Sequence, residues 1–347
     1  MTRQTWTALV SALTFVVLAV ALVAIPVPFV TWSPGRTRDT LGMVDSKPMI
    51  EVQGIQAYPT SGRLDLTVVE VTKAGARLSL PQALVAYWLP NRDVLPLDAV
   101  YAPGKSVEEV QAEEADMMST AQDDAVVAAL RADDRPVSTL PVVYSVTVGG
   151  PAHTRLLPGD LVLAVDGVPT PDHSEVSEQI RSHRPGDTVT FRVVRQRVET
   201  TVPVPTVEST TQGGVPVVGI TLRRGYRYQP RISFELGRRI GGPSAGLVFA
   251  LAIYDKITPG PLLAGRHVAG TGSINADGQV GRIGAIQEKI AGAENAGASV
   301  FLVPAANCPD LAGIRTDMTL VKVGTLTDAI GALQNLQQGA HERVPRC

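Results

Sequence analysis

A glycine- and proline-rich segment that opens directly into an apolar run constrains this sequence most. Residues 240–246 (Ile-Gly-Gly-Pro-Ser-Ala-Gly) precede the wholly apolar residues 247–252. Gly242 leaves the backbone free to turn, and Pro243 suits the first position of a helix, where its missing N–H is not needed. The pattern predicts a buried helix with Ser244 at its N-terminus, where unpaired N–H groups and the helix dipole favour negative charge.

A second predicted helix, at residues 283–293, carries a lysine beside its apolar stripe. Ile286, Ile290 and Ala293 form the stripe, and Lys289 adjoins it rather than lying opposite. A serine hydroxyl is a weak nucleophile until a neighbouring base takes its proton. Lysine can be that base only when burial lowers its pKa, because desolvation disfavours the ammonium form. The ordinary alternatives are a serine that only caps a helix and a lysine that is solvated.

Three motifs follow one another through this region. Residues 242–246 are Gly-Pro-Ser-Ala-Gly, residues 270–274 are Gly-Thr-Gly-Ser-Ile, and residues 278–289 end in Gln-Glu-Lys. In this order and spacing they resemble the proteolytic domain of Lon-type serine proteases, and the resemblance covers about residues 231–305. It implies a Ser/Lys dyad that needs neither His nor Asp.

The resemblance implies a role for individual residues. Ser244 is the expected nucleophile, Lys289 the expected general base, and Thr271 the residue that orients the lysine. Gly242 and Pro243 shape the turn that presents the serine. Backbone N–H groups around Gly242 and Ser244 are the expected donors to the oxyanion.

Two further segments complete the expected site. Members of the Lon family usually carry Asp three residues before the serine, and this chain has Gly241 there. A neighbouring strand, with Ser233, Phe234 and Glu235, is expected to hold the substrate extended. The five histidines show no metal-ligand spacing, so we expect neither a metal nor a cofactor.

The first 35 residues are expected to form a short tail and a transmembrane anchor. Residues 5–35 carry no charge, and residues 6–30 are almost continuously apolar. That run is longer than the ~20 residues with which a helix crosses a bilayer. Trp6 and Trp32 flank it, as interfacial aromatic residues do. A cleaved signal peptide is the alternative, although its apolar region would usually be about 7–15 residues.

Flanking charges do not fix the orientation of this segment, because Arg3 lies on one side and Arg36 and Arg38 on the other. An anchor this close to the N-terminus is typical of an uncleaved export signal. Cys308 and Cys347 can form a disulfide in an oxidising compartment, and two free thiols are the alternative. We therefore expect a single-pass protein of a bacterial cell membrane, with the bulk of the chain extracytoplasmic.

Residues 36–135 give the weakest patterns. Residues 63–71 alternate like a half-buried strand, and we hypothesise that this strand joins the protease fold. Ser79 and Pro81 predict a short helix that ends before Pro90.

A Gly-Lys-Ser sequence at 104–106 resembles the end of a phosphate-binding loop. The first glycine of that motif should fall at position 99, which is an alanine. Residues 106–109 instead form a capping box that predicts a long acidic helix. With no Walker motif and a net charge of −2, we expect neither a nucleotide nor a nucleic acid as partner.

From about residue 136 the sequence changes to short strands separated by Gly and Pro turns. Pro-Gly-Asp at 158–160 and 185–187 and Asp-Gly at 166–167 each stand between apolar strands. The pattern resembles a PDZ domain of the kind associated with bacterial proteases, which implies a groove for an extended peptide or a C-terminus. The usual carboxylate-binding loop is not recognisable at 135–140, so a packing module without a peptide ligand is the alternative.

These patterns predict an α+β multidomain chain. The expected parts are a transmembrane helix in residues 1–35, an N-terminal region at 36–135, a β-rich PDZ domain at 136–206 and a Lon-type α/β protease domain at 207–347. The predicted function is ATP-independent serine endopeptidase activity on unfolded or flexible extracytoplasmic proteins, with the PDZ domain for substrate selection or regulation. Protein or peptide substrates are the expected partners, and the resemblance implies a homo-oligomeric ring.

Two alternative functions use the same patterns. One is a catalytically inactive, membrane-tethered PDZ adaptor, and the other is a protease limited to processing its own chain.

Overall fold

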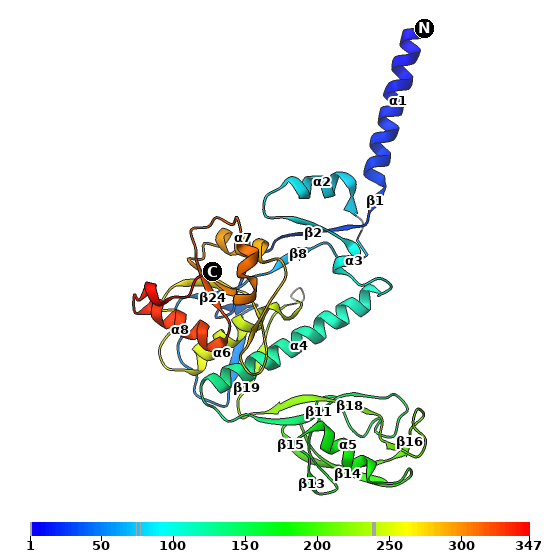
Figure 1. Cartoon of the computed structure of the whole chain (residues 1–347), viewed down its shortest axis with the longest axis vertical. Coiled ribbons are helices and arrows are strands. Elements are labelled where there is room, and N and C mark those ends of the chain that lie inside the picture. The colour runs from blue at the N-terminus through cyan, green and yellow to red at the C-terminus, as the bar shows by residue number, and fades with distance from the viewer. Residues whose placement is uncertain (1, 74, 77, 238–240) are drawn as a thin grey trace. The chain divides into compact units, whose positions relative to one another are not determined.

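The computed structural model describes residues 2–73, 75–76, 78–237 and 241–347, which form two compact units (Figure 1). Unit 1 combines Met1–Asp134 with Pro230–Cys347, and unit 2 is the intervening Arg135–Gln229. Unit 2 is therefore an insertion. Its first strand, β11 (Ser138–Val146), pairs antiparallel with its last, β18 (Ile220–Arg227), which brings the two ends of the insertion together.

The end of the inserted unit differs from the sequence-based expectation. Residues 207–229 were expected in the catalytic domain, but the structure places them in unit 2. The reason is that β18 completes the sheet of unit 2 along the full length of β11, from Ser138 opposite Arg227 to Val146 opposite Ile220. The paired residues lie far apart in the sequence, so no local pattern indicates that they pair.

The central sheet of unit 1 has the strand order β24-β23-β20-β7-β3. All neighbouring pairs are parallel except the edge strand β3, which is antiparallel to β7. Every residue of β23 is buried. The strands are β3 (Arg38–Asp39), β7 (Arg63–Leu66), β20 (His267–Gly270), β23 (Val300–Pro304) and β24 (Thr319–Val323).

The strand expected at 63–71 is two strands in different sheets. Strand β7 pairs with β20, so residues that precede unit 2 contribute a strand to the same sheet as residues that follow it. The chain then leaves this sheet, and β8 (Val69–Val71) pairs with β2 (Phe29–Pro34). Because the chain changes partners between Leu66 and Val69, the prediction of one continuous strand at 63–71 was wrong.

A second layer of unit 1 lies near the N-terminal helix α1 (Arg3–Ala24). Helix α1 has no buried residue. It is long and apolar enough to cross a membrane, and a signal sequence can have the same length and composition. Sheet β10-β2-β8 and helix α2 follow. The remaining elements of this layer are β1 (Pro26–Val27), β9 (Leu78–Ser79), α2 (Leu80–Trp88), β10 (Asp93–Pro96) and α3 (Leu97–Val100).

The long helix α4 (Val107–Ala132) begins at the expected capping box, in which the Ser106 hydroxyl accepts from the Glu109 N–H. It packs against α6 (Gly246–Ile257) and α8 (Leu326–Gln337). At its C-terminal end, Arg131 donates to the carbonyl of Ala276 and to the Asp277 carboxylate, in the hairpin between β21 (Ser273–Ile274) and β22 (Val280–Gly281). Helix α4 is therefore part of the core of unit 1.

Unit 2 is a sheet of order β15-β14-β12-β11-β18 packed with helix α5 around Phe191 and the valines of its strands. Strand β11 is paired on both sides, so the open edges of the described sheet are β15 and β18. The other elements are β12 (Leu161–Val165), β13 (Val168–Pro169), α5 (His173–Arg181), β14 (Thr188–Arg195), β15 (Val198–Pro205), β16 (Val207–Glu208) and β17 (Pro216–Val217).

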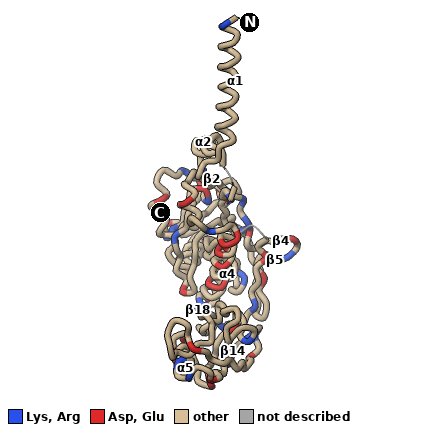
Figure 2. The backbone as a smooth tube through the Cα atoms, turned by 90° about the vertical axis from the view of Figure 1, so that its right-hand side faces the viewer, with Lys and Arg blue, Asp and Glu red and all other residues tan. Residues whose placement is uncertain are grey.

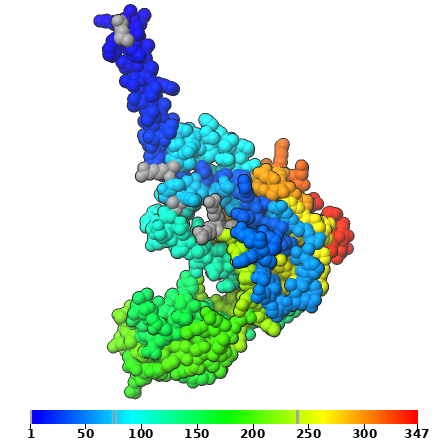
Figure 3. All heavy atoms as spheres, turned by 180° about the vertical axis from the view of Figure 1, so that it is seen from behind, coloured from blue at the N-terminus to red at the C-terminus, as the bar shows by residue number. Residues whose placement is uncertain are grey.

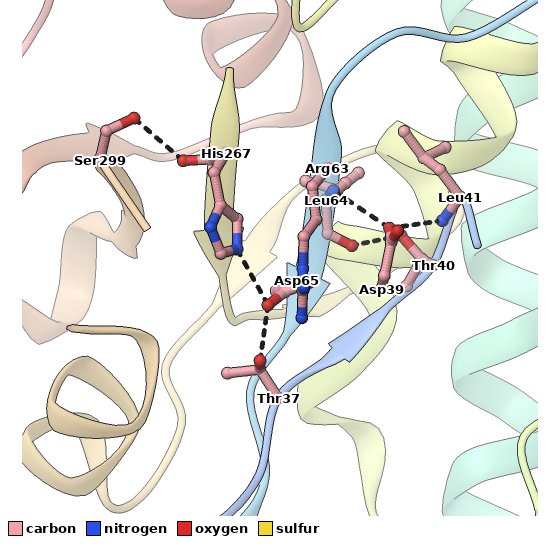
Figure 4. Close-up of polar contacts among 9 residues, drawn as sticks. All are labelled: Thr37, Asp39, Thr40, Leu41, Arg63, Leu64, Asp65, His267 and Ser299. Atoms are coloured by element: carbon pink, nitrogen blue, oxygen red, sulfur yellow. Dashed lines mark hydrogen bonds and ion pairs between the residues drawn. The ribbon is translucent and has the colours of Figure 1, made fainter. Parts of the chain in front are cut away.

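A buried carboxylate ties the parallel strands of unit 1 together (Figure 4). Asp65 on β7 is fully buried and accepts hydrogen bonds from Arg63 and Thr37, and His267 Nε2 on β20 lies 3.0 Å from its Oδ2. Burial alone would raise the pKa of Asp65, but these hydrogen bonds outweigh it and lower the pKa below its usual value. The Ser299 hydroxyl donates to the backbone carbonyl of His267 rather than to its ring, so the group is not a Ser-His-Asp triad.

We predict that Asp65→Asn lowers the free energy of unfolding at pH 7 by about 1–3 kcal/mol, because Arg63 and His267 lose a charged acceptor. A lowered carboxyl pKa contributes stability above about pH 4, which is lost as the pH falls through the folded-state pKa. The parent should therefore lose more stability than the variant between pH 5 and pH 2. Urea unfolding of the full chain measures both quantities, and Asp45→Asn, at an exposed turn, is the control.

The start of α6 approaches β21 so closely that only glycine fits. A Cβ on Gly246 would lie 2.9 Å from Ile274 Cγ2 and 3.0 Å from the Ile274 nitrogen. We predict that Gly246→Ala destabilises the protein by about 1–3 kcal/mol, because backbone on both sides must shift. Gly331→Ala is the matched control, because nothing lies within 4 Å of its Cβ position on α8. That change should stabilise the helix by about 0.5–1 kcal/mol in the same urea titration, and equal effects of the two changes would contradict the prediction.

Candidate active site

The serine turn precedes the apolar helix instead of forming its first turn. Pro243–Ala245 form a short 3-10 helix, η1, and α6 begins at Gly246. Gly242 has φ 81°, in the left-handed region that favours glycine. The Ser244 carbonyl accepts from the Gly272 N–H at 2.8 Å, and the Gly272 carbonyl accepts from Leu247 at 3.0 Å. The strand end after β20 therefore fixes the turn on both sides of the half-buried Ser244.

Lys289 lies on α7 (Ile286–Asn295), which starts three residues later than the expected helix at 283–293. Ala285, directly before the helix, has left-handed backbone angles (φ 57°, ψ 42°) that a helix does not contain. Asn307 holds Ile283 further upstream, because its side chain accepts from the Ile283 N–H and donates to the Ile283 carbonyl. Lys289 is only 5% exposed. This burial lowers its pKa to about 8, although the neighbouring Glu288 carboxyl acts in the opposite direction.

Thr271 connects the lysine to the serine turn. Lys289 Nζ donates to Thr271 Oγ1 at 3.1 Å, and the same hydroxyl donates to the Ser244 carbonyl at 3.1 Å. Thr271 is 1% exposed, so both hydrogen bonds lie away from solvent. The structure thus brings together Ser244, Lys289 and Thr271.

Helix α4 contributes Glu114 beside the serine turn, a contact that the sequence analysis missed. The Gly242 N–H donates to the Glu114 carbonyl at 3.4 Å. A Cβ on Gly241 would lie 3.2 Å from Glu114 Oε2, so the Glu114 side chain fills space that a side chain at 241 would need. In this conformation the Gly242 N–H is therefore engaged by α4 rather than directed at a substrate. Only the packing of α4 reveals that Glu114 contacts the serine turn.

Glu288 and Asp93 form a second pair, next to Lys289, that the sequence did not indicate. Glu288 is 1% exposed, and its pKa is raised to about 7 by burial together with the nearby Asp93 carboxyl on β10. Both residues line a cavity of about 230 Å³ at the start of α7, with Arg282 and Asp310 at its wall. Glu288 adjoins Lys289 in the sequence, but nothing in the sequence indicates that Asp93 is its neighbour.

The expected substrate strand is β19 (Arg231–Phe234), followed by Glu235. It pairs antiparallel with β6 (Ile50–Gln53), with Ser233 opposite Glu51, and the Phe234 ring packs on Phe249 of α6 with ring centroids 5.1 Å apart. Strand β6 is the one strand that pairs with β19 among the described elements. The opposite edge of β19 therefore has no strand partner there.

The two cysteines form a disulfide that ties the C-terminus to the protease core. Cys308 lies in η2 (Ala305–Leu311), and its Cα is 5.1 Å from that of Cys347. Among the residues that the structure describes, no three His, Cys, Asp or Glu side chains are grouped so that they could hold a metal ion.

Comparison with known proteins finds two family models that match different parts of the chain. The family model for the Lon protease C-terminal proteolytic domain matches residues 239–334, and that for the PDZ domain matches residues 117–206. The Lon protease of Roseiflexus castenholzii is 44% identical over 70 residues, and Lon protease 1 of Sorangium cellulosum is 35% identical over 111 residues. These matches cover 20% and 30% of this chain, but only 8% and 13% of the relatives.

Among solved structures, the PDZ domain of an SdrC-like protein from Listeria monocytogenes is 29% identical, with a TM-score of 0.22. The match covers 24% of this chain and 85% of that domain. The sequence matches to the family models agree with the two resemblances on which the sequence analysis depends. This chain therefore carries a PDZ domain and a C-terminal proteolytic domain of the Lon serine protease family.

Proposed function

We propose that this protein is a membrane-anchored, ATP-independent serine endopeptidase that uses Ser244 and Lys289 as a catalytic dyad. The observation that carries the proposal is the burial of Lys289 together with its hydrogen bond to Thr271, which itself donates to the Ser244 carbonyl. A lysine with a pKa of about 8 is substantially neutral at mildly alkaline pH, as a general base must be.

In the proposed mechanism, neutral Lys289 Nζ takes the proton from Ser244 Oγ as the oxygen attacks the carbonyl carbon of a peptide bond. A backbone N–H of the serine turn stabilises the resulting oxyanion. The lysine ammonium then protonates the leaving amine, and the acyl-enzyme forms. Neutral Lys289 then takes a proton from water as the water oxygen attacks the acyl carbon. The lysine ammonium returns that proton to Ser244 Oγ as the ester bond breaks, which releases the carboxylic acid product and the free hydroxyl. Thr271 is a positioning residue that keeps the lysine directed at the serine turn.

Substrate binding by strand addition fits both units. The edge of β19 that faces away from β6 would hold an extended segment next to the serine turn, and an open edge of the sheet in unit 2, such as β18, would bind a peptide in the same manner. Strand addition requires an extended chain, which favours unfolded or flexible substrates. The Gly-Lys-Ser sequence lacks the first glycine of a phosphate-binding loop, and its Ser106 is the N-cap of α4, which supports the proposal that cleavage needs no ATP.

The test is cleavage of unfolded casein by the full chain in lipid nanodiscs without ATP. We predict that Ser244→Ala abolishes cleavage and that Lys289→Arg lowers its rate by about 10²–10⁴-fold, because arginine stays protonated. In the parent the rate should rise with pH through a midpoint of about 8 as Lys289 loses its proton. Lys322→Arg, at an exposed position, is the matched control and should cleave like the parent.

The outcomes separate the proposed activity from its alternatives. An active Lys289→Arg variant would contradict the dyad. A parent that cleaves neither casein nor its own chain would favour the PDZ adaptor. A parent that shortens only itself, with the fragment absent in Ser244→Ala, would favour a self-processing protease.

We further propose that the protease unit is extracytoplasmic, which the Cys308–Cys347 disulfide supports. We predict that cells lysed in an alkylating agent yield protein in which neither cysteine is modified unless a reductant is added first. Intact-mass measurement counts the alkyl groups. Alkylation of both thiols without reductant would place this unit in a reducing compartment and contradict the proposal.

A further inference from the structure

Helix α2 exposes its large apolar side chains and buries its small ones. Ala83 and Ala86 are 6% and 5% exposed and face the protein. The outer face of α2 is formed by the four side chains at positions 84, 85, 87 and 88, which adjoin one another at 100° per residue. Their exposed fractions are Leu84 40%, Val85 54%, Tyr87 71% and Trp88 74%.

This arrangement is the reverse of a helix on the surface of a water-soluble domain, which buries large apolar residues and exposes polar ones. Helix α2 contains no charged residue, as Figure 2 shows. Scattered exposed apolar side chains are ordinary, but a contiguous apolar face that includes Tyr and Trp marks a surface made for an apolar partner. Tyr and Trp are also the residues that concentrate at the interface between a bilayer and water.

The chain holds α2 beside the end of α1. Strand β1 starts two residues after α1 ends and pairs with β9, with Pro26 opposite Ser79. Ser79 is the N-cap of α2, so the first turn of α2 lies next to the point where α1 ends. Helices α1 and α2 are in contact, and Figures 1 and 3 show α2 at the foot of α1.

The length of α1 sets the depth at which its C-terminal end lies in a membrane. Its 22 residues at 1.5 Å each give about 33 Å, close to the ~30 Å hydrocarbon core of a bilayer. The C-terminal end of a spanning α1 therefore lies at the boundary between acyl chains and headgroups. Because the β1–β9 pairing fixes α2 at that end, α2 lies at the same boundary.

We propose that α2 is an interfacial helix whose outer face enters the leaflet that α1 leaves. Leu84 and Val85 lie among the upper acyl chains, and the rings of Tyr87 and Trp88 lie at the level of the headgroups. This inference rests on the proposed membrane anchor, and it adds a second contact surface of stated chemistry, a lipid bilayer.

The contact also places the protease next to the membrane. Strand β10 follows α2 and pairs with β2. On β2, the Trp32 ring lies 3.2 Å from the Cβ position of Gly284, just before the lysine helix α7. A single layer of strands therefore separates the proposed lipid-bound helix from the catalytic region. Flexible segments of proteins close to the bilayer are the substrates that this placement favours.

The test attaches an environment-sensitive fluorophore to one introduced cysteine at a time, since both native cysteines are in the disulfide. The full chain is placed in nanodiscs that carry nitroxides near the top of some acyl chains and near the end of others. Leu13→Cys reports on α1, Tyr87→Cys on α2, and Met43→Cys, 65% exposed on β4 (Met43–Val44), is the control. We expect quenching at 13 and 87 and none at 43.

Quenching at 13 without quenching at 87 would overturn the α2 proposal and leave the anchor intact. Absence of quenching at both, with a mass that starts after α1, would instead show that the anchor proposal fails. A blue-shifted but unquenched label at 87 would indicate burial against protein, such as a second copy, and would also overturn the proposal.

A variant separates insertion from mere proximity to α1. Leu84→Gln, Val85→Gln and Trp88→Gln together replace outward-facing side chains and leave the buried alanines in place. We expect the label at 87 to lose its quenching in this variant while the label at 13 keeps it. Unchanged quenching at 87 would show that the outer face of α2 does not drive the contact, and would overturn the proposal.

Discussion

The proposed catalytic site depends most on the burial of the Lys289 ammonium group. Lys289 is nearly fully buried, and its hydrogen bond to Thr271 joins it to the carbonyl of Ser244. Water would satisfy the ammonium better than a single hydroxyl does, so burial lowers its pKa to about 8. The surrounding core must therefore be rigid enough to hold a lysine that would otherwise reach solvent. The proposed chemistry depends on this lowered pKa, which makes the neutral amine available at mildly alkaline pH.

The elements that provide this rigidity come from distant parts of the chain. Strand β7 precedes the inserted unit and pairs with β20, whose C-terminal end leads into Thr271. Helix α4 packs on α6, contacts the serine turn through Glu114 and binds the β21–β22 hairpin through Arg131. The proteolytic fold is therefore completed by residues on both sides of unit 2.

Local patterns predicted the features that local chemistry determines. The capping box at Ser106 starts α4, and Ser79 starts α2. The family resemblance, rather than a local pattern, indicated Ser244, Thr271 and Lys289, which two hydrogen bonds connect. Features that depend on contacts distant in the sequence were missed or misplaced. Residues 63–71 divide between two sheets, and residues 207–229 belong to unit 2, because their strands pair with strands distant in the sequence. Glu114 and Asp93 contact residues more than 100 positions away. No periodicity encodes them.

The most direct test of the central claim is the rate at which a fluorophosphonate modifies Ser244, followed by intact mass across a pH series. The parent and Lys289→Arg are compared in nanodiscs, so the readout depends on the dyad and not on a protein substrate. The account predicts a rate in the parent that rises with pH through a midpoint of about 8, and almost no modification of Lys289→Arg at any pH. Equal modification of the two proteins, or a rate in the parent that does not change with pH, would contradict it.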